Sequence, residues 1–127
     1  MHSYINPPQL TKPTSYTHVV KASGGQTVYI SGQIAFDKDG KVIGAGDFRA
    51  QTVQVFENLK AALAAAGATF DDVVKLTTFV TDMKNAPILR EVRAEYFGKQ
   101  PPAGTLVQIA GLVIPELMIE VEAIAVV

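Results

Sequence analysis

The chain ends in the stretch Leu117-Met118-Ile119-Glu120-Val121-Glu122-Ala123-Ile124-Ala125-Val126-Val127, which predicts a strand at the centre of a sheet. Side chains alternate between the two faces of a strand, so one face here is entirely apolar. The other face carries Glu120 and Glu122, which would lie about 7 Å apart. A carboxylate on a central strand is costly unless it is paired, hydrogen-bonded or part of a functional site. Two interpretations stay open: a functional carboxylate, or a pair that faces water or a neighbouring subunit.

Length and composition predict one domain over residues 1–127, because 127 residues can bury a substantial core. The hydrophobic content of 48% favours buried contacts between subunits. The net charge is −1 and the basic residues form no cluster, so binding to nucleic acid is not expected.

The chemistry of metals and thiols is also not expected. The chain has no cysteine and therefore no disulfide, thiol nucleophile or thiolate ligand. Its two histidines are too few for a usual zinc site, and we predict neither a metal nor another cofactor. Neither a signal peptide nor an apolar run long enough to cross a bilayer is evident, so we expect a cytoplasmic protein without a membrane partner.

Hydrophobic periodicity predicts the element order β-β-α-β-α-β-β. The predicted strands cover residues 15–22, 27–36, 73–81, 101–110 and 117–127, and the predicted helices cover residues 48–66 and about 86–97. This order predicts an α+β fold, with one mixed sheet and both helices on one of its faces. The first two strands are expected to form a hairpin across the turn Ser23–Gln26. The open face of such a sheet needs cover, which a homo-oligomer would provide.

The predicted helix over residues 48–66 has an apolar face and a polar face. We assign Val53, Phe56, Leu59 and Leu63 to the buried face, and Gln51, Gln54, Glu57, Asn58 and Lys60 to the opposite face.

Gly32 lies inside the strand predicted for residues 27–36. A glycine within a strand marks a bulge, or a close approach by another backbone or a ligand. Both interpretations are kept.

Several blocks of the chain resemble the Rid/YjgF family, a group of reactive-intermediate (enamine/imine) deaminases that older descriptions call endoribonucleases. The blocks are Val28–Gln33, Gln54–Leu59, Val80–Met83, Pro101–Ala103 and Ile119–Ala125, in the family's order. The resemblance implies a chorismate-mutase-like fold. It also implies a homotrimer that binds a small molecule in a cleft at each subunit interface.

The resemblance also implies roles for individual residues. Glu120 matches the glutamate that holds the attacking water, and Tyr16 and Gly32 match residues that face the ligand. The family's arginine, which binds the substrate carboxylate bidentately, is replaced here by Gly104. An asparagine of the second helix corresponds to Arg90.

Three hypotheses follow from the missing arginine. In the leading one, the protein is a deaminase that hydrolyses C=N bonds and binds the substrate anion through backbone N–H groups near Thr105. In the second, Arg90 supplies the missing charge; its alternative is a solvated Arg90 paired with a nearby glutamate. In the third, the trimer is not an enzyme and binds a metabolite or a protein partner. Endoribonuclease activity is the least favoured function, because the chain has neither a basic stripe nor an evident metal cluster.

Overall fold

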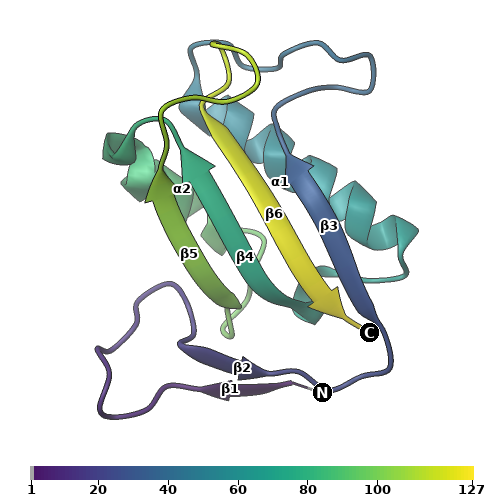
Figure 1. Cartoon of the computed structure of the whole chain (residues 1–127), viewed down its shortest axis with the longest axis vertical. Helices are drawn as coiled ribbons and strands as arrows, with labels where there is room; N and C mark the ends of the chain where they lie inside the picture. The colour runs from purple at the N-terminus through teal and green to yellow at the C-terminus, as the bar shows by residue number, and fades with distance from the viewer. Residues whose placement is uncertain (1) are drawn as a thin grey trace.

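A four-stranded mixed sheet forms the body of the protein in the computed structural model, which describes residues 2–127 (Figure 1). Across the sheet the strands are β3 (Thr27–Gln33), β6 (Ile119–Val126), β4 (Val73–Val80) and β5 (Ala103–Gln108). β6 runs antiparallel to both of its neighbours, whereas β5 is parallel to β4. β6 is therefore an inner strand, as its apolar pattern predicts.

Both helices lie on one face of this sheet, behind the strands in Figure 1. They are α1 (Phe48–Ala65) and α2 (Ala86–Ala94), and single 3₁₀ turns at Phe70–Asp72 and Met83–Asn85 precede β4 and α2. The predicted α+β fold with two helices on one face is confirmed. Between residues 2 and 127, no helix is both long enough and apolar enough to span a membrane.

The hydrophobic core lies between the helices and the inner face of the sheet. Along β6, the residues Ile119, Val121, Ala123 and Ala125 are all buried, and they pack with apolar residues of both helices. The intervening positions, which include Glu120 and Glu122, face away from the helices. The alternation in the sequence therefore sets which face of β6 packs against the helices.

The N-terminal part of the chain differs from the prediction. Two short strands, β1 (Ser3–Ile5) and β2 (Val19–Lys21), pair with each other below the main sheet in Figure 1. The predicted hairpin between residues 15–22 and 27–36 is therefore wrong. The N–H groups of Gly25 and Gln26 donate to the carbonyl of Val127, so the predicted turn extends the pairing of β3 with β6.

The buried face of α1 also differs from the prediction. Gln51 is 0% exposed, whereas Val53 is 38% exposed and Val55 takes the core position. Hydrogen bonds of the Gln51 side-chain amide explain why this residue is buried. The amide nitrogen donates to the carbonyls of Gly44 and Glu116, at 3.2 and 2.8 Å, and the amide oxygen accepts from the Met118 N–H at 2.9 Å. The side chain thus satisfies backbone groups of the loop before β6.

Replacing Gln51 with leucine is expected to lower the free energy of unfolding by about 3 kcal/mol. The leucine would fill a similar volume but leave buried carbonyl and N–H groups without partners, at about 1–3 kcal/mol for each. Urea unfolding at a fixed protein concentration measures the change. The exposed Gln9→Leu variant is the control and should unfold like the parent. Equal stability of the two variants would contradict the structural role of Gln51.

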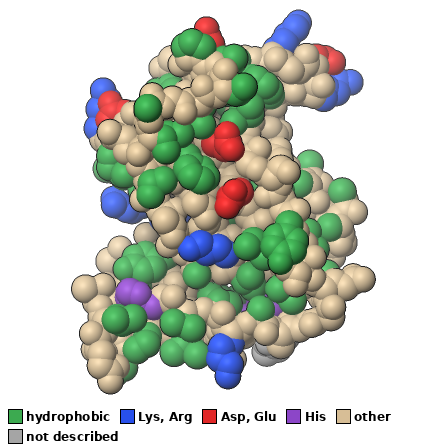
Figure 2. Space-filling view, in the orientation of Figure 1, with side chains coloured by type: hydrophobic (Ala, Val, Ile, Leu, Met, Phe, Trp, Pro, Cys, Tyr) green, Lys and Arg blue, Asp and Glu red, His purple; other side chains and the backbone are tan. Residues whose placement is uncertain are grey.

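The face of the sheet opposite the helices is open in the single chain. Its side chains mix charge with apolar surface, and Tyr29 is 77% exposed. Lys75 donates to the Thr105 hydroxyl at 2.8 Å on this face. Figure 2 shows acidic and basic side chains near the middle of the face, with hydrophobic side chains around them. This surface therefore lacks the uniformly apolar character of a core.

Candidate functional site

A cavity of about 230 Å³ lies at the outer edge of β5, between that strand, α2 and the segment that precedes β2. We call it the edge cavity. Most of the predicted ligand-binding residues line it, namely Tyr16, Arg90, Gly104 and Thr105. The other lining residues are Thr14, Ser15, Arg93 and Leu106. The fold thus brings together residues that are far apart in the sequence.

Thr17 holds the segment around Tyr16 against the start of β5. Its N–H donates to the Pro102 carbonyl at 3.2 Å, and its hydroxyl donates to the Pro101 carbonyl. The Thr17 side chain is buried, and the two prolines keep the chain extended as it enters β5. The position of Tyr16 beside Gly104 therefore follows from the hydrogen bonds that join Thr17 to these two prolines.

Gly104 leaves open space in the edge cavity. A β-carbon built on this residue would have the Tyr16 Cβ and the Leu76 carbonyl oxygen as its nearest neighbours, both at 3.9 Å. Its backbone conformation is one that other residues adopt, since φ is not positive. A side chain could therefore be accommodated here, and its absence makes room for part of a ligand.

Two guanidinium groups from α2 lie at this space. Arg93 is half-buried and donates to the Ser15 hydroxyl at 2.9 Å, whereas Arg90 is exposed. Neither forms an ion pair with a carboxylate within residues 2–127, and the neighbouring Glu91 pairs with Arg49 at 3.3 Å. Burial lowers the pKa of the Arg93 guanidinium, and the charge of Arg90 lowers it further. The cavity wall therefore carries positive charge without an acidic partner.

Arg93 lines the edge cavity, although the sequence analysis gave it no role. The signal was present, because Arg90 and Arg93 are three residues apart and so share one face of a helix. What the sequence did not show is which way this face points. In the structure, the face of α2 that carries Arg90 and Arg93 borders the cavities beside β5.

Glu120 and Gly32 form a second group, on β6 and β3. A methyl group on Gly32 would overlap the Glu120 carboxylate, whose Cδ would lie 2.7 Å from the added carbon. The register between β3 and β6 also shifts between Ile30 and Gln33. The register shift agrees with the bulge interpretation. The group that approaches Gly32 within the chain is the Glu120 side chain, and not the backbone or ligand of the other interpretation.

The Glu120 carboxylate is half-buried. No hydrogen bond or ion pair engages it in the part of the chain that the structure describes. Its oxygens can therefore accept hydrogen bonds from a water molecule or a ligand.

The two groups do not meet within one chain. Glu120 is paired with Phe79 of β4, and Phe79 with Val107 of β5, so two strand spacings separate Glu120 from β5. Thr105 lies two residues further along β5. These offsets place the two groups on the order of 12 Å apart. Gly104 also pairs with Leu76, a buried residue of the helix-facing side, whereas Glu120 faces the open side.

Comparison with known proteins assigns the family. A family model described as Endoribonuclease L-PSP matches residues 8–127. The chain belongs to this family, the Rid/YjgF family. A RutC family protein from Pyrococcus horikoshii is 43% identical over 111 residues, which cover 87% of this chain and 85% of that protein.

Solved structures of Rid/YjgF relatives share the fold. A Rid family protein of unknown function from Yersinia pestis, YyfB, is 37% identical, with a TM-score of 0.92 over 99% of this chain and 98% of that one. TdcF from E. coli, solved with bound serine, is 33% identical, with a TM-score of 0.74 over 84% of each chain. The family fold implied by the sequence blocks is thus confirmed.

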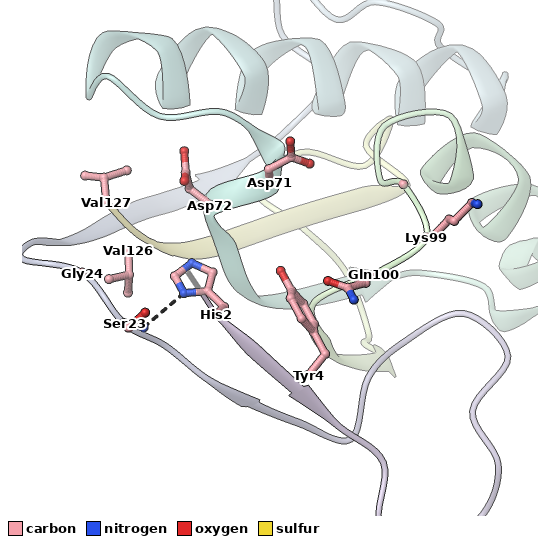
Figure 3. Close-up of a pocket in the computed structure, with 11 residues that line it drawn as sticks. His2, Tyr4, Ser23, Gly24, Asp71, Asp72, Lys99, Gln100, Val126 and Val127 are labelled. Atoms are coloured by element: carbon pink, nitrogen blue, oxygen red, sulfur yellow. Dashed lines mark hydrogen bonds between the residues drawn. The ribbon is translucent and has the colours of Figure 1, made fainter.

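A second hollow, of about 700 Å³, lies where the N-terminal hairpin meets the end of the sheet (Figure 3). His2 and Tyr4 point into it from the hairpin, and Asp71 and Asp72 lie on the opposite wall. Two of the polar groups there have structural partners. The His2 Nδ1 accepts from the Ser23 N–H at 3.1 Å, and the Asp72 carboxylate caps the turn at Phe70–Asp72. None of the predicted site residues lines this hollow.

Among residues 2–127, no three His, Cys, Asp or Glu side chains come together in a way that could hold a metal ion.

Proposed function

We propose that this Rid/YjgF protein hydrolyses small enamines or imines in a cleft between subunits of a homotrimer. Glu120 positions the water, and the edge cavity binds the rest of the substrate. The observation that carries the proposal is the Glu120 carboxylate, which lies against Gly32 with its oxygens free of partners among residues 2–127. The proposal keeps the cytoplasmic location that the sequence predicts.

The separation of the two groups supports a cleft completed by a second copy. One chain presents Glu120 on its open sheet face and the edge cavity beside β5, on the order of 12 Å apart. Packing of the open faces against one another would cover surface such as Tyr29, which is largely exposed in one chain. A copy placed in this way could set the edge cavity of one subunit near Glu120 of the next.

The proposed reaction is balanced by one water molecule. The water oxygen attacks the carbon of the C=N bond while the Glu120 carboxylate accepts a proton from the water. The nitrogen gains protons, the C–N bond breaks, and ammonia leaves with a carbonyl product. Imines also hydrolyse without a catalyst, so positioning and one proton transfer are sufficient contributions from the protein.

A second function is favoured by Gly104. Its position lacks the arginine that binds the substrate carboxylate in the deaminases this chain resembles, so the protein could bind a metabolite without catalysis. The relative TdcF was solved with bound serine, a small amino acid. A ligand of that class needs the cavity but does not need a positioned water.

Hydrolysis of freshly generated 2-iminopropanoate and 2-iminobutanoate tests the proposal. We expect the protein to release ammonia and 2-oxo acid faster than buffer does, and to elute as a trimer in light scattering. A monomer would contradict the intersubunit cleft. A trimer that fails to accelerate either reaction but binds serine or a 2-oxo acid would support the second function. The Gly104→Arg variant, assayed beside it, shows whether the family's arginine adds activity to this scaffold.

A further inference from the structure

The two arginines of α2, Arg90 and Arg93, line two adjoining cavities. Besides the edge cavity, a second cavity of about 220 Å³ lies between α2, the start of the N-terminal segment and the entry to β5. Both are lined by Ser15, Arg90 and Arg93, and Lys99 joins them in the second one. Neither lining includes an aspartate or a glutamate.

This excess of positive charge is not explained by folding. Two guanidinium groups close together repel one another, and burying part of Arg93 costs solvation. The structure offers Arg93 a neutral hydroxyl, that of Ser15, and no carboxylate within residues 2–127. An anion in the cavity would relieve both costs, because each guanidinium can donate two parallel hydrogen bonds to a carboxylate.

The open space at Gly104 determines where such an anion can sit. Gly104 contributes no side chain to the space that Tyr16 and Arg93 line, so the acidic group of a ligand bound there would lie next to Arg93. A single carboxylate would leave one of the two positive charges unbalanced. A ligand with two acidic groups would balance both.

We propose that Arg93, assisted by Arg90, makes this site selective for small organic dianions. The proposal rests on the proposed function for the reaction itself and adds the substrate class, an imine that carries a second acidic group. Arg93 binds the acidic group from the helix side and thus replaces, from another direction, the charge that is absent at Gly104. A carboxylate and a phosphate share this chemistry, and the test below separates them.

The binding test uses the full chain at low ionic strength, because screening weakens the exposed Arg90 most. Succinate, acetate and inorganic phosphate are titrated, and the Nε–H signals of the arginines are followed by nuclear magnetic resonance. We expect succinate to bind about tenfold or more tightly than acetate, and to shift the Arg93 signal. Tighter binding of phosphate than of succinate would assign the site to phosphate esters.

Variants separate charge from structure. Arg93→Met should remove the preference for succinate, Arg90→Met should weaken it, and Arg93→Lys should keep part of it through charge alone. Arg49→Met is the matched control, since it removes an arginine of α1 that pairs with Glu91, and it should leave the preference unchanged. If Arg93→Met fails to fold, the Arg93→Lys and Arg90→Met titrations still show whether the preference for succinate depends on these two arginines. A preference that is absent in the parent, or unchanged in Arg90→Met and Arg93→Lys, would overturn the proposal.

A turnover measurement distinguishes this proposal from the proposed function. We expect a higher kcat/KM for 2-iminosuccinate than for 2-iminopropanoate, and loss of that ratio in Arg93→Met. Hydrolysis of both imines at equal kcat/KM would overturn the selectivity and leave the deaminase function standing. Selective binding of succinate without hydrolysis of either imine would overturn the deaminase function and leave the dianion site standing.

Discussion

Replacing Glu120 with glutamine is expected to lower kcat/KM for hydrolysis of 2-iminopropanoate by about 10²–10⁴-fold, the usual contribution of a positioned general base. Glutamine keeps the shape of the side chain and its contact with Gly32, but it cannot accept the proton of the attacking water. The structure leaves the Glu120 oxygens without partners in residues 2–127, so the change breaks no hydrogen bond or ion pair within this range. The fold should therefore be unaffected.

Glu122→Gln is the matched control for this experiment. Glu122 lies two residues further along β6, on the same face of the strand, and is exposed. It pairs with Thr77 of β4 and has no contact comparable to that of Glu120 with Gly32. We expect Glu122→Gln to retain activity within about threefold, on the general expectation that surface substitutions have small effects.

The two variants also discriminate between functions. Ammonia release is measured for both, beside the uncatalysed reaction in buffer. An active parent and an equally active Glu120→Gln variant would exclude Glu120 as the base. An inactive parent whose affinity for serine is unchanged by Glu120→Gln would instead favour a binding protein.

The fold could be predicted from the sequence to the extent that local patterns coincide with long-range packing. The apolar alternation of residues 117–127 correctly indicates an inner strand, as the structure confirms. The predicted hairpin between residues 15–22 and 27–36 was wrong because the sequence of a strand does not specify which other strand it pairs with. Residues 19–21 alternate equally well against β3 or against β1, and the structure pairs them with β1.

The error at Gln51 has a related cause. Periodicity counts a glutamine as polar and assigns it to solvent, but a buried amide can replace water as a partner for loop carbonyls. Which loop returns to α1 is decided by the fold, since Glu116 and Met118 are more than sixty residues away. The sequence contains no nearby signal for this contact.

The candidate site was predicted in part. Tyr16, Arg90, Gly104 and Thr105 do line one cavity, a grouping that the family resemblance implies. Arg93 was missed because the resemblance assigns it no role and the spacing alone does not give its direction. The roles of all these residues, and of Glu120, stay predictions until the assays above are made.

Replacing Gly32 with alanine is expected to lower kcat/KM for the same imine by about 10²-fold, the loss that a displacement of about 1 Å can cause. The added methyl group would occupy the place of the Glu120 carboxylate, so that carboxylate must move away from β3. Only the flexible end of a side chain is displaced, and φ at Gly32 is not positive, so the backbone tolerates alanine. The free energy of unfolding should therefore change by less than about 1 kcal/mol.

Gly111→Ala is the control, because an added methyl group there meets no atom within 4 Å. Activity is measured by ammonia release and stability by urea unfolding, for both variants at the same protein concentration. Loss of activity with unchanged stability in Gly32→Ala alone would show that the position of the Glu120 carboxylate, beyond its presence, is required. Full activity in Gly32→Ala would contradict the role of this contact. Since Glu120→Gln keeps the contact and removes the charge while Gly32→Ala keeps the charge and removes the contact, the pair separates acid–base chemistry from positioning at one carboxylate.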